Sequence, residues 1–117
     1  MIAMWGLKNC DSCRCARQWF DARNIGYVFH DVRDETPDRA HVSHWLDAVG
    51  SDVLVNRRST TWRGLPAAER TRIDSGDPVP VLILYPALLK RPVLEFGNRV
   101  LAGFNAAEYE RVTWNSR

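Results

Sequence analysis

The sequence has no cysteine outside residues 10–15, where all three of its cysteines lie. A structural disulfide framework would spread its cysteines along the chain, so this clustering excludes a disulfide-stapled fold and indicates a site. The chain also lacks an apolar run long enough to cross a membrane. Residues 1–6 are too short for a signal peptide, and no apolar h-region follows them. We therefore expect a cytoplasmic protein, in which a Cys-x-x-Cys pair serves metal binding or redox chemistry.

The sequence also has little excess charge and no low-complexity segment. Its 16 Lys and Arg residues against 14 Asp and Glu residues give a net charge of +2. Because the basic residues are scattered among acidic ones, the pattern argues against direct binding of nucleic acid. The 117 residues match the size of one ordinary domain, and the 45% of hydrophobic residues supply a core. No linker or repeat divides the chain, so we expect a single domain over residues 1–117.

The first third of the chain has the pattern of a strand, a helix and a second strand. Residues 1–6 form a short apolar run that ends in glycine, which is typical of a buried strand. Apolar residues then recur at helical spacing over 11–24, and 27–32 is again typical of a strand. A βαβ unit with links this short predicts two parallel strands joined by a right-handed crossover.

Helices are expected in the middle of the chain. Thr36 is a good N-cap and Pro37 suits the first helical position, so a helix should begin there and end at Gly50. A second short helix is expected over residues 65–76. Together with the segment that follows, these helices should form an insertion at about residues 36–86.

Residues 77–85, with the sequence DPVPVLILY, fit two structures. The apolar residues 81–84 favour a strand by propensity. Asp77, however, is a good N-cap, and Pro78 fits the first position of a helix, where its missing N–H costs nothing. We favour a short buried helix that ends before Pro86.

The last third of the chain predicts a hairpin and a final helix. Segments 92–96 and 99–103 flank a Gly-Asn pair, which is typical of a tight hairpin. Residues 105–108 resemble a capping box that opens a helix through Val112. The whole order is β-α-β, helical insertion and β-β-α. It predicts an α/β protein with a thioredoxin-like fold and a mixed four-stranded sheet.

The cysteine cluster suggests a nucleophilic or redox centre. Cys10 lies where the first strand gives way to the helix, and the positive helix end favours a thiolate there. Lys8 and Arg14 would strengthen this effect, while Asp11 would oppose it. Cys13 follows one helical turn later, so its thiol can reach the Cys10 sulfur. Cys10 is then the attacking thiolate and Cys13 the resolving thiol.

Two other interpretations of the cluster stay open. Cys15 is interpreted as a small core residue, and Cys13 could pack beside it, so that only Cys10 is exposed. A zinc site would need a second pair of ligands, for which His41 and His44 are the candidates. These two histidines fit better as a solvated face of their helix, so we expect no metal.

Four segments of the sequence together resemble a known family. The segments KNCDSCRCARQWF, NRRSTTWRGL, LLKRPVL and VLAGFNAAEY occur in the order and spacing of the ArsC/Spx family. The likeness is closest to its YffB-like branch, which is often described as arsenate-reductase-like, and it covers essentially the whole chain. The resemblance implies a thioredoxin fold with a helical insertion, which matches the order of elements above.

The resemblance also implies roles for individual residues. Cys10 matches the family's catalytic cysteine, and Pro92 matches a cis-proline that faces it. Arg58 and Arg91 match two arginines that approach an anion at the site. The chemistry of arginine agrees with this anion-binding role, because its guanidinium offers planar donors to an oxyanion such as arsenate or to the carboxylates of glutathione. From the residues alone, Arg58 would be a solvated residue in a basic stretch.

Two positions differ from the arsenate reductases of the family. Those enzymes have a third arginine where this chain has Gly103, and a histidine where it has Gly6. Lys8 could replace the electrostatic effect of that histidine. Both differences weigh against arsenate as the natural substrate. Lys90 is expected to be solvated, and Trp62 to pack in the core of the insertion.

Two functions follow from the residues and the resemblance together. The first is a glutathione-dependent thiol reductase, in which Cys10 attacks an oxidised substrate or a mixed disulfide. Glutathione is then the co-substrate, and glutaredoxin a further candidate partner. The alternative is an Spx-like transcriptional regulator that binds RNA polymerase and uses a disulfide between Cys10 and Cys13 as a switch. Neither function calls for a membrane.

Overall fold

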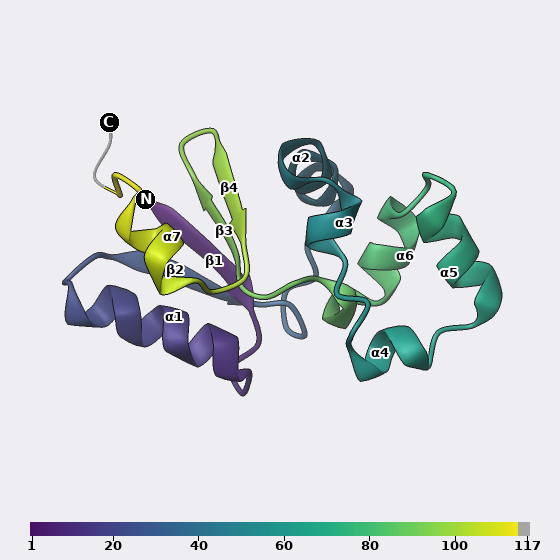
Figure 1. Ribbon diagram of the computed structural model, residues 1–117, viewed down its shortest axis with the longest axis horizontal. Helices are drawn as coiled ribbons and strands as arrows, with labels where there is room; N and C mark the ends of the chain where they lie inside the picture. The colour runs from purple at the N-terminus through teal and green to yellow at the C-terminus, as the bar shows by residue number, and fades with distance from the viewer. Residues whose placement is uncertain (115–117) are drawn as a thin grey trace.

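A computed structural model describes residues 1–114 of the chain. A four-stranded sheet forms its centre, with the strand order β2-β1-β3-β4 (Figure 1). β1 pairs with β2 in parallel, and the pairs β1–β3 and β3–β4 are antiparallel. The mixed sheet predicted from the sequence is therefore confirmed. The strands are β1 (Ile2–Gly6), β2 (Tyr27–Asp31), β3 (Val93–Phe96) and β4 (Arg99–Ala102).

Helices cover both faces of this sheet. Because side chains alternate along a strand, β1 sends Met4 to one face and Trp5 to the other. Met4 packs with Phe20 and Tyr109 from the helices α1 (Asp11–Ala22) and α7 (Ala106–Glu110). On the opposite face, Trp5 packs with Trp45 from α2 (Arg39–Val49). The sheet is thus buried on both sides, and each face has its own apolar cluster.

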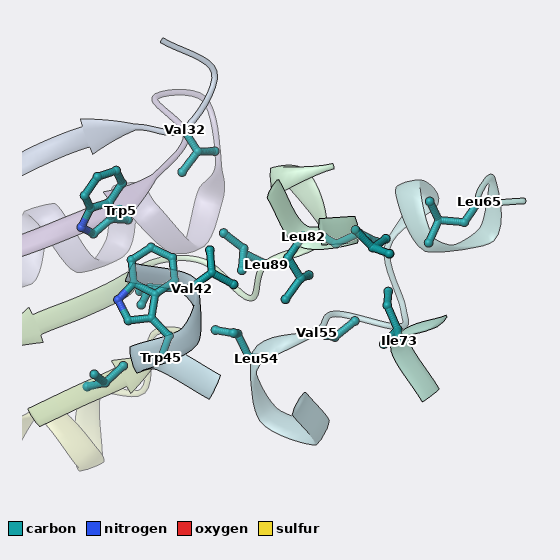
Figure 2. Packing of buried hydrophobic residues seen from close by; sticks show 14 residues of the cluster. Trp5, Val32, Val42, Trp45, Leu54, Val55, Leu65, Ile73, Leu82 and Leu89 are labelled. Atoms are coloured by element: carbon teal, nitrogen blue, oxygen red, sulfur yellow. The ribbon is translucent and has the colours of Figure 1, made fainter. Parts of the chain in front are cut away.

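The helical insertion lies to one side of the sheet and lengthens the molecule to 44 Å, against 27 and 26 Å in the other directions (Figure 1). One buried cluster runs without a break from Trp5 in the sheet through Leu54 and Leu89 to Ile73 and Leu65 in the insertion (Figure 2). The insertion therefore shares its core with one face of the sheet. Its elements after α2 are α3 (Ser51–Leu54), α4 (Thr60–Arg63), α5 (Ala67–Asp74), α6 (Val79–Leu84) and the 3-10 turn η1 (Pro86–Leu88).

The ambiguous segment 77–85 is a helix, as favoured above. α6 begins after Pro78, which is its N-cap, and ends at Leu84, before Pro86. Asp77 is not the cap, since its carboxylate accepts a hydrogen bond from Arg72 at 3.0 Å. The strand propensity of the segment is overridden because two of its apolar side chains are fully buried in the insertion.

The predicted starts and ends of four helices need correction. α2 begins at Arg39 and not at Thr36–Pro37, because Asp38 is the N-cap. α1 ends at Ala22, and Asn24 adopts a left-handed φ of 55° that stops the chain from continuing the helix. α7 ends at Glu110, two residues before the predicted Val112. The predicted cap of α7 is confirmed. The helix predicted over 65–76 spans Ala67–Asp74 as α5, and the short helices α3 and α4 were not predicted.

The cap of α2 leads to a first testable prediction. The Asp38 carboxylate accepts a hydrogen bond from the His41 backbone N–H at 2.9 Å. Asp38→Ala should therefore lower the free energy of unfolding by about 1 kcal/mol. Urea denaturation followed by circular dichroism measures the change. Asp47→Ala, which removes an exposed carboxylate from the last turns of the same helix, is the matched control. Equal losses from both substitutions would contradict a capping role.

No helix within residues 1–114 is both long enough and apolar enough to cross a membrane.

Candidate active site around Cys10

Cys10 occupies the point where the first strand has ended and the first helix begins. It is the N-cap residue of α1, with extended backbone angles. The Cys10 carbonyl accepts the first helical hydrogen bond, from Arg14 N–H at 2.9 Å. The side chain is half-buried. This position places the sulfur beside the free N–H groups at the start of a helix, where negative charge is stabilised.

The surroundings of Cys10 favour its thiolate. Partial burial of the thiol would by itself raise its pKa. Hydrogen bonds from the Cys13 backbone N–H, the Arg91 guanidinium and the Cys13 thiol outweigh that effect, and the positive charge of Arg91 adds to them. The pKa of Cys10 therefore lies below its ordinary value. A larger fraction of Cys10 is then ionised at neutral pH, which is the form that attacks disulfides.

Arg91 is held against the site by its own hydrogen bonding. Its Nη1 donates to the Ala87 carbonyl at 2.6 Å, while its Nε is buried and has no protein partner among the described residues. The Arg91–Pro92 peptide bond is cis, as the resemblance implied. The Pro92 carbonyl accepts a hydrogen bond from Gly103 N–H at 2.8 Å. The link from η1 to β3 thus presents Arg91 to the Cys10 sulfur.

Cys13 is fully buried beneath Cys10, and its thiol keeps its proton. Burial and, to a smaller extent, the neighbouring Cys10 raise the pKa of Cys13 to about 12. The Leu7 backbone N–H, 3.5 Å from the Cys13 sulfur, opposes this only in part. The two cysteines therefore form a thiolate and a thiol that donates to it. This arrangement suits a nucleophile with a second sulfur in reserve.

Gly6 makes room for the Cys13 sulfur. A Cβ built on Gly6 would lie 2.4 Å from the Cys13 Sγ, closer than two such atoms can approach. Gly6 is the position at which the arsenate reductases resembling this chain have a histidine. Here the second sulfur occupies the space that a side chain at residue 6 would need. The absence of a side chain at residue 6 therefore lets the Cys13 sulfur lie against the end of β1.

Arg58 lies apart from the thiolate, at a hollow of about 440 Å³ next to the site. It is exposed, and its backbone N–H donates to Asn56 Oδ1 at 3.1 Å. Its carbonyl accepts a hydrogen bond from Arg63 Nη1 at 3.1 Å. Arg91, and not Arg58, is among the groups that lower the pKa of Cys10. The structure therefore separates the two predicted anion-binding arginines.

The other charges near the cysteines are paired with acids. The Lys8 Nζ lies 3.2 Å from Asp34 Oδ2, with both side chains exposed, and Arg14 forms an ion pair with Asp11. Neither cation is free to act on Cys10 alone. An effect of Lys8 on the anion or on Cys10 stays a prediction, and its charge is shared with Asp34.

The expectation that Cys15 is a core residue is wrong. Cys15 is exposed, whereas Cys13 is fully buried. Two residues span about 200° around a helix, so side chains at 13 and 15 point to nearly opposite sides. Trp62 does pack against the core of the insertion, half-buried, with the Arg57 guanidinium 5.2 Å from its ring.

The two histidines considered for zinc lie elsewhere. His41 Nδ1 is 2.8 Å from the Asp38 carboxylate, and its ring lies 5.1 Å from that of Trp5. His44 is exposed. Within residues 1–114, no three His, Cys, Asp or Glu side chains are grouped so that they could hold a metal ion.

Asp31 is a residue of the site that sequence reasoning missed. Its side chain is 2% exposed, and it accepts hydrogen bonds from the backbone N–H groups of Lys8 at 3.1 Å and Arg33 at 2.9 Å. The Arg33 side-chain and backbone hydrogen bonds, together with that of Lys8, lower the pKa of Asp31 to about 2 against the opposing effect of burial. Arg17 Nη2 donates to the Lys8 carbonyl at 3.1 Å. Asp31 and Arg17 thus fix the loop that leads into Cys10.

A signal for Asp31 does exist in the sequence. It is the next-to-last residue of the strand predicted over 27–32, and the carboxyl ends of neighbouring parallel strands meet at one edge of a sheet. In the structure Asp31 pairs with Gly6, the last residue of β1, directly before the loop to Cys10. An acidic residue at this position is therefore well placed to bind the free N–H groups of that loop.

Comparison with known proteins decides the family. The model of the ArsC family matches residues 5–112. The chain belongs to the ArsC family. An uncharacterised protein from Haemophilus influenzae is 38% identical over 110 residues, covering 94% of this chain and 96% of that protein. The global transcriptional regulator Spx of Streptococcus pneumoniae is 27% identical, covering 92% and 82% of the two chains.

Solved structures of family members confirm the fold. A protein named YffB superposes with a TM-score of 0.88 at 34% identity, covering 94% of this chain and 96% of that one. An arsenate reductase (ArsC) related protein from Brucella melitensis gives a TM-score of 0.73 at 36% identity, with 93% and 91% covered. The thioredoxin-like fold and the resemblance to the YffB-like branch and Spx are therefore confirmed.

The contrast between the three thiols of this ArsC-family chain gives a second prediction. At neutral pH, a short pulse of iodoacetamide should label Cys10 and the exposed Cys15 and leave Cys13 unmodified, because Cys13 is buried and protonated. Mass spectrometry of tryptic peptides reports each site. In urea, the unfolded protein should also be labelled at Cys13. This control shows that the folded structure is what protects that thiol. Labelling of Cys13 as fast as Cys15 in the folded protein would contradict the geometry.

Proposed function

We propose that this protein is a glutathione-dependent thiol–disulfide reductase with Cys10 as its nucleophile. One observation carries the proposal: the site holds a thiolate and a buried thiol side by side, with the pKa of Cys10 lowered and that of Cys13 raised. Redox enzymes that cleave disulfides need this combination of an ionised attacking sulfur and a reserve sulfur. The membership in the ArsC family, which includes arsenate-reductase-like structures, is in keeping with it.

The first step of the proposed reaction is a thiolate–disulfide exchange. The Cys10 thiolate attacks one sulfur of an oxidised substrate, R–S–S–R′. The S–S bond of the substrate breaks, a new bond forms between Cys10 and the R sulfur, and R′S⁻ leaves and takes a proton from water. Arg91, which hydrogen-bonds to Cys10, also lies where it would stabilise an anionic group of the substrate. In the proposal, Pro92, which follows Arg91 through a cis peptide bond, faces Cys10 across the bound substrate.

Two routes resolve the mixed disulfide. Cys13 loses its proton and attacks the Cys10 sulfur, which releases RS⁻ and leaves a disulfide between the two cysteines. Two molecules of glutathione then reduce this disulfide and leave as oxidised glutathione, so that both electrons come from glutathione. Alternatively, a glutathione thiolate attacks the substrate sulfur of the mixed disulfide. The bond to Cys10 breaks, the Cys10 thiolate is restored, and R–S–SG leaves, which is oxidised glutathione when R is itself glutathionyl.

The experiment that tests the proposal follows the release of glutathione from a glutathionylated peptide in the presence of excess glutathione. The protein should catalyse the release, and a mixed disulfide on Cys10 should be detectable by mass spectrometry after acid quenching. Cys15→Ser, which removes an exposed thiol outside the site, should retain the activity. Release no faster than without protein would refute the proposal. The proposal also assumes a reducing compartment such as the cytosol, where glutathione is abundant.

A second function is favoured by the curated relatives. Those named Spx are transcriptional regulators and match 92% of this chain. In this alternative, the Cys10–Cys13 pair is a switch that changes the affinity for RNA polymerase when it forms a disulfide. Purified polymerase should then retain the protein on an affinity column in one redox state only. Retention that is absent in both states would eliminate the regulator and leave the reductase.

A further inference from the structure

Lys90 lies in an unusual position over a glycine. A Cβ built on Gly103 would lie 2.8 Å from the Lys90 Cε and 3.5 Å from its Cγ, so the lysine side chain occupies the space that a side chain at residue 103 would fill. Gly103 is buried and has a φ of 85°, a conformation in which a side chain is strained. The methylene groups of the Lys90 side chain therefore pack against the backbone at Gly103.

That backbone is itself fixed. The Gly103 N–H donates to the Pro92 carbonyl at 2.8 Å, and the Gly103 carbonyl accepts a hydrogen bond from the Tyr109 hydroxyl at 2.9 Å. On the lysine side, the Lys90 backbone N–H donates to the Leu54 carbonyl at 2.7 Å. Both ends of the contact are thus anchored to the core. An ordinary surface lysine has many rotamers, but this one has fewer because its stem lies in a groove over Gly103.

Lys90 lines the hollow of about 440 Å³ that also contains Arg58. The acidic residue of this hollow, Asp52, has a fully exposed side chain and lies 4.0 Å from Arg57. Arg57 also pairs with Asp74 at 3.0 Å. Within residues 1–114, neither Lys90 nor Arg58 has a carboxylate partner. The hollow thus contains two cations whose charge is not neutralised by the protein.

We infer that Lys90 is a substrate-binding residue, and that the hollow it shares with Arg58 binds a carboxylate of the disulfide or thiol that reacts at Cys10. This inference rests on the proposed function and adds the substrate class: thiols and disulfides that carry a carboxylate some distance from the sulfur. Lys90 directly precedes Arg91, which hydrogen-bonds to Cys10. A molecule of tripeptide length spans ~10 Å when extended, so its sulfur and its carboxylate can occupy separate positions.

The chemistry of the hollow fits a carboxylate better than a neutral group. Lysine and arginine both donate charge-assisted hydrogen bonds to carboxylates, and Asn56 lines the same hollow. The site is open to water, so each cation contributes modestly, and its contribution weakens as salt is added. The hollow therefore selects among substrates and leaves the chemical step to Cys10 and Arg91.

The test separates binding from reaction. S-methylglutathione keeps both carboxylates of glutathione but cannot form a disulfide. Its dissociation constant is measured by NMR titration for the wild type, for Lys90→Gln and for Arg39→Gln. Arg39 is an exposed cation at the start of α2, so its replacement matches the change in net charge. Lys90→Gln should raise the dissociation constant about fivefold at low salt, while Arg39→Gln leaves it unchanged.

The reaction is measured in parallel with a neutral disulfide, bis(2-hydroxyethyl) disulfide. Its rate of reaction with Cys10 should be the same in the wild type and in Lys90→Gln, because Lys90 takes no part in the exchange. A dissociation constant for S-methylglutathione that Lys90→Gln leaves unchanged would overturn the inference. Failure of the wild type to react with the neutral disulfide would instead count against the proposed reductase, so the two failures are distinct.

A second variant tests the position of the lysine without removing its charge. Gly103→Ala would displace the Lys90 stem, because the new Cβ meets it at 2.8 Å. If the variant is folded by circular dichroism, it should also weaken binding of S-methylglutathione. Tight binding by folded Gly103→Ala would overturn the positioning of Lys90 by Gly103. Lys90→Gln still tests the binding site where the glycine variant does not fold.

Discussion

Cys10→Ser should abolish disulfide exchange by this protein. The serine hydroxyl is not ionised at neutral pH and is a far weaker nucleophile than a thiolate, so the rate should fall by ~10³-fold or more. Release of glutathione from a glutathionylated peptide measures the loss. The substitution changes one atom at a half-buried position, so the thermal stability should change little.

Cys13→Ser is the informative comparison. It keeps the Cys10 nucleophile and the backbone N–H of residue 13, but it removes the second sulfur. The first exchange step should therefore continue, while an intramolecular disulfide can no longer form. With little glutathione present, the mixed disulfide on Cys10 should accumulate, and mass spectrometry detects it. Full activity in Cys10→Ser would show that another thiol, such as the exposed Cys15, carries the reaction.

Asp31→Ala should be among the most destabilising single substitutions in the chain. The Asp31 carboxylate is 2% exposed and binds the backbone N–H groups of Lys8 and Arg33. Without it, these donors lose their partner at the end of the sheet. The free energy of unfolding should fall by about 3 kcal/mol, as is typical when a buried charged hydrogen-bond acceptor is removed. Urea denaturation measures the loss.

The same carboxylate predicts how stability depends on pH. The pKa of Asp31 is lowered to about 2 in the folded protein, from 3.8 for an ordinary aspartate, so the folded state favours the ionised form. Its contribution is fully present above about pH 5 and is lost as the pH falls towards 2; it amounts to ~2 kcal/mol. Asp31→Asn should remove this pH dependence. A wild type and an Asp31→Asn variant that lose stability in parallel between pH 5 and 2 would contradict the account.

The order of elements could be predicted because each depends on local pattern. The apolar run of β1, the Gly-Asn turn of the hairpin and the cap at Asn105 depend on neighbouring residues, and all three are confirmed. The start of α2 was misplaced because two good N-caps, Thr36 and Asp38, stand two residues apart. Local preference alone does not choose between these two caps. In the structure Pro37 is buried in the loop before α2, and the helix begins after Asp38.

The site was only partly predictable for a different reason. Cys10 and Cys13 are close in sequence, so helical geometry brings them together, and the environment of Arg91 followed from the resemblance. Asp31 lies 23 residues from Lys8, whose N–H it binds, and Lys90 lies 13 residues from Gly103. No local pattern reports contacts of this range, because they depend on strand pairing and loop packing. Lys90 was expected to be an ordinary solvated lysine, and only the contact with Gly103 sets it apart.

The misassignment of Cys15 has a simpler cause. The direction of Cys10 says nothing about which side of α1 is buried, because Cys10 lies outside the helix as its N-cap. The buried face of α1 is instead defined by Cys13, Ala16 and Phe20. Measured from Cys13, residue 15 is turned by about 200° and faces solvent. The reference for a helical face must be a residue within the helix.

The pKa of the Cys10 thiol tests the central claim most directly. It is measured from the rate of alkylation against pH in the Cys15→Ser background, where Cys13 is buried and Cys10 is the reactive thiol. The account predicts a pKa below that of an ordinary cysteine, and a rise towards the ordinary value in Arg91→Leu, because that substitution removes a hydrogen bond and a positive charge from the sulfur. An ordinary pKa that Arg91→Leu leaves unchanged would contradict it.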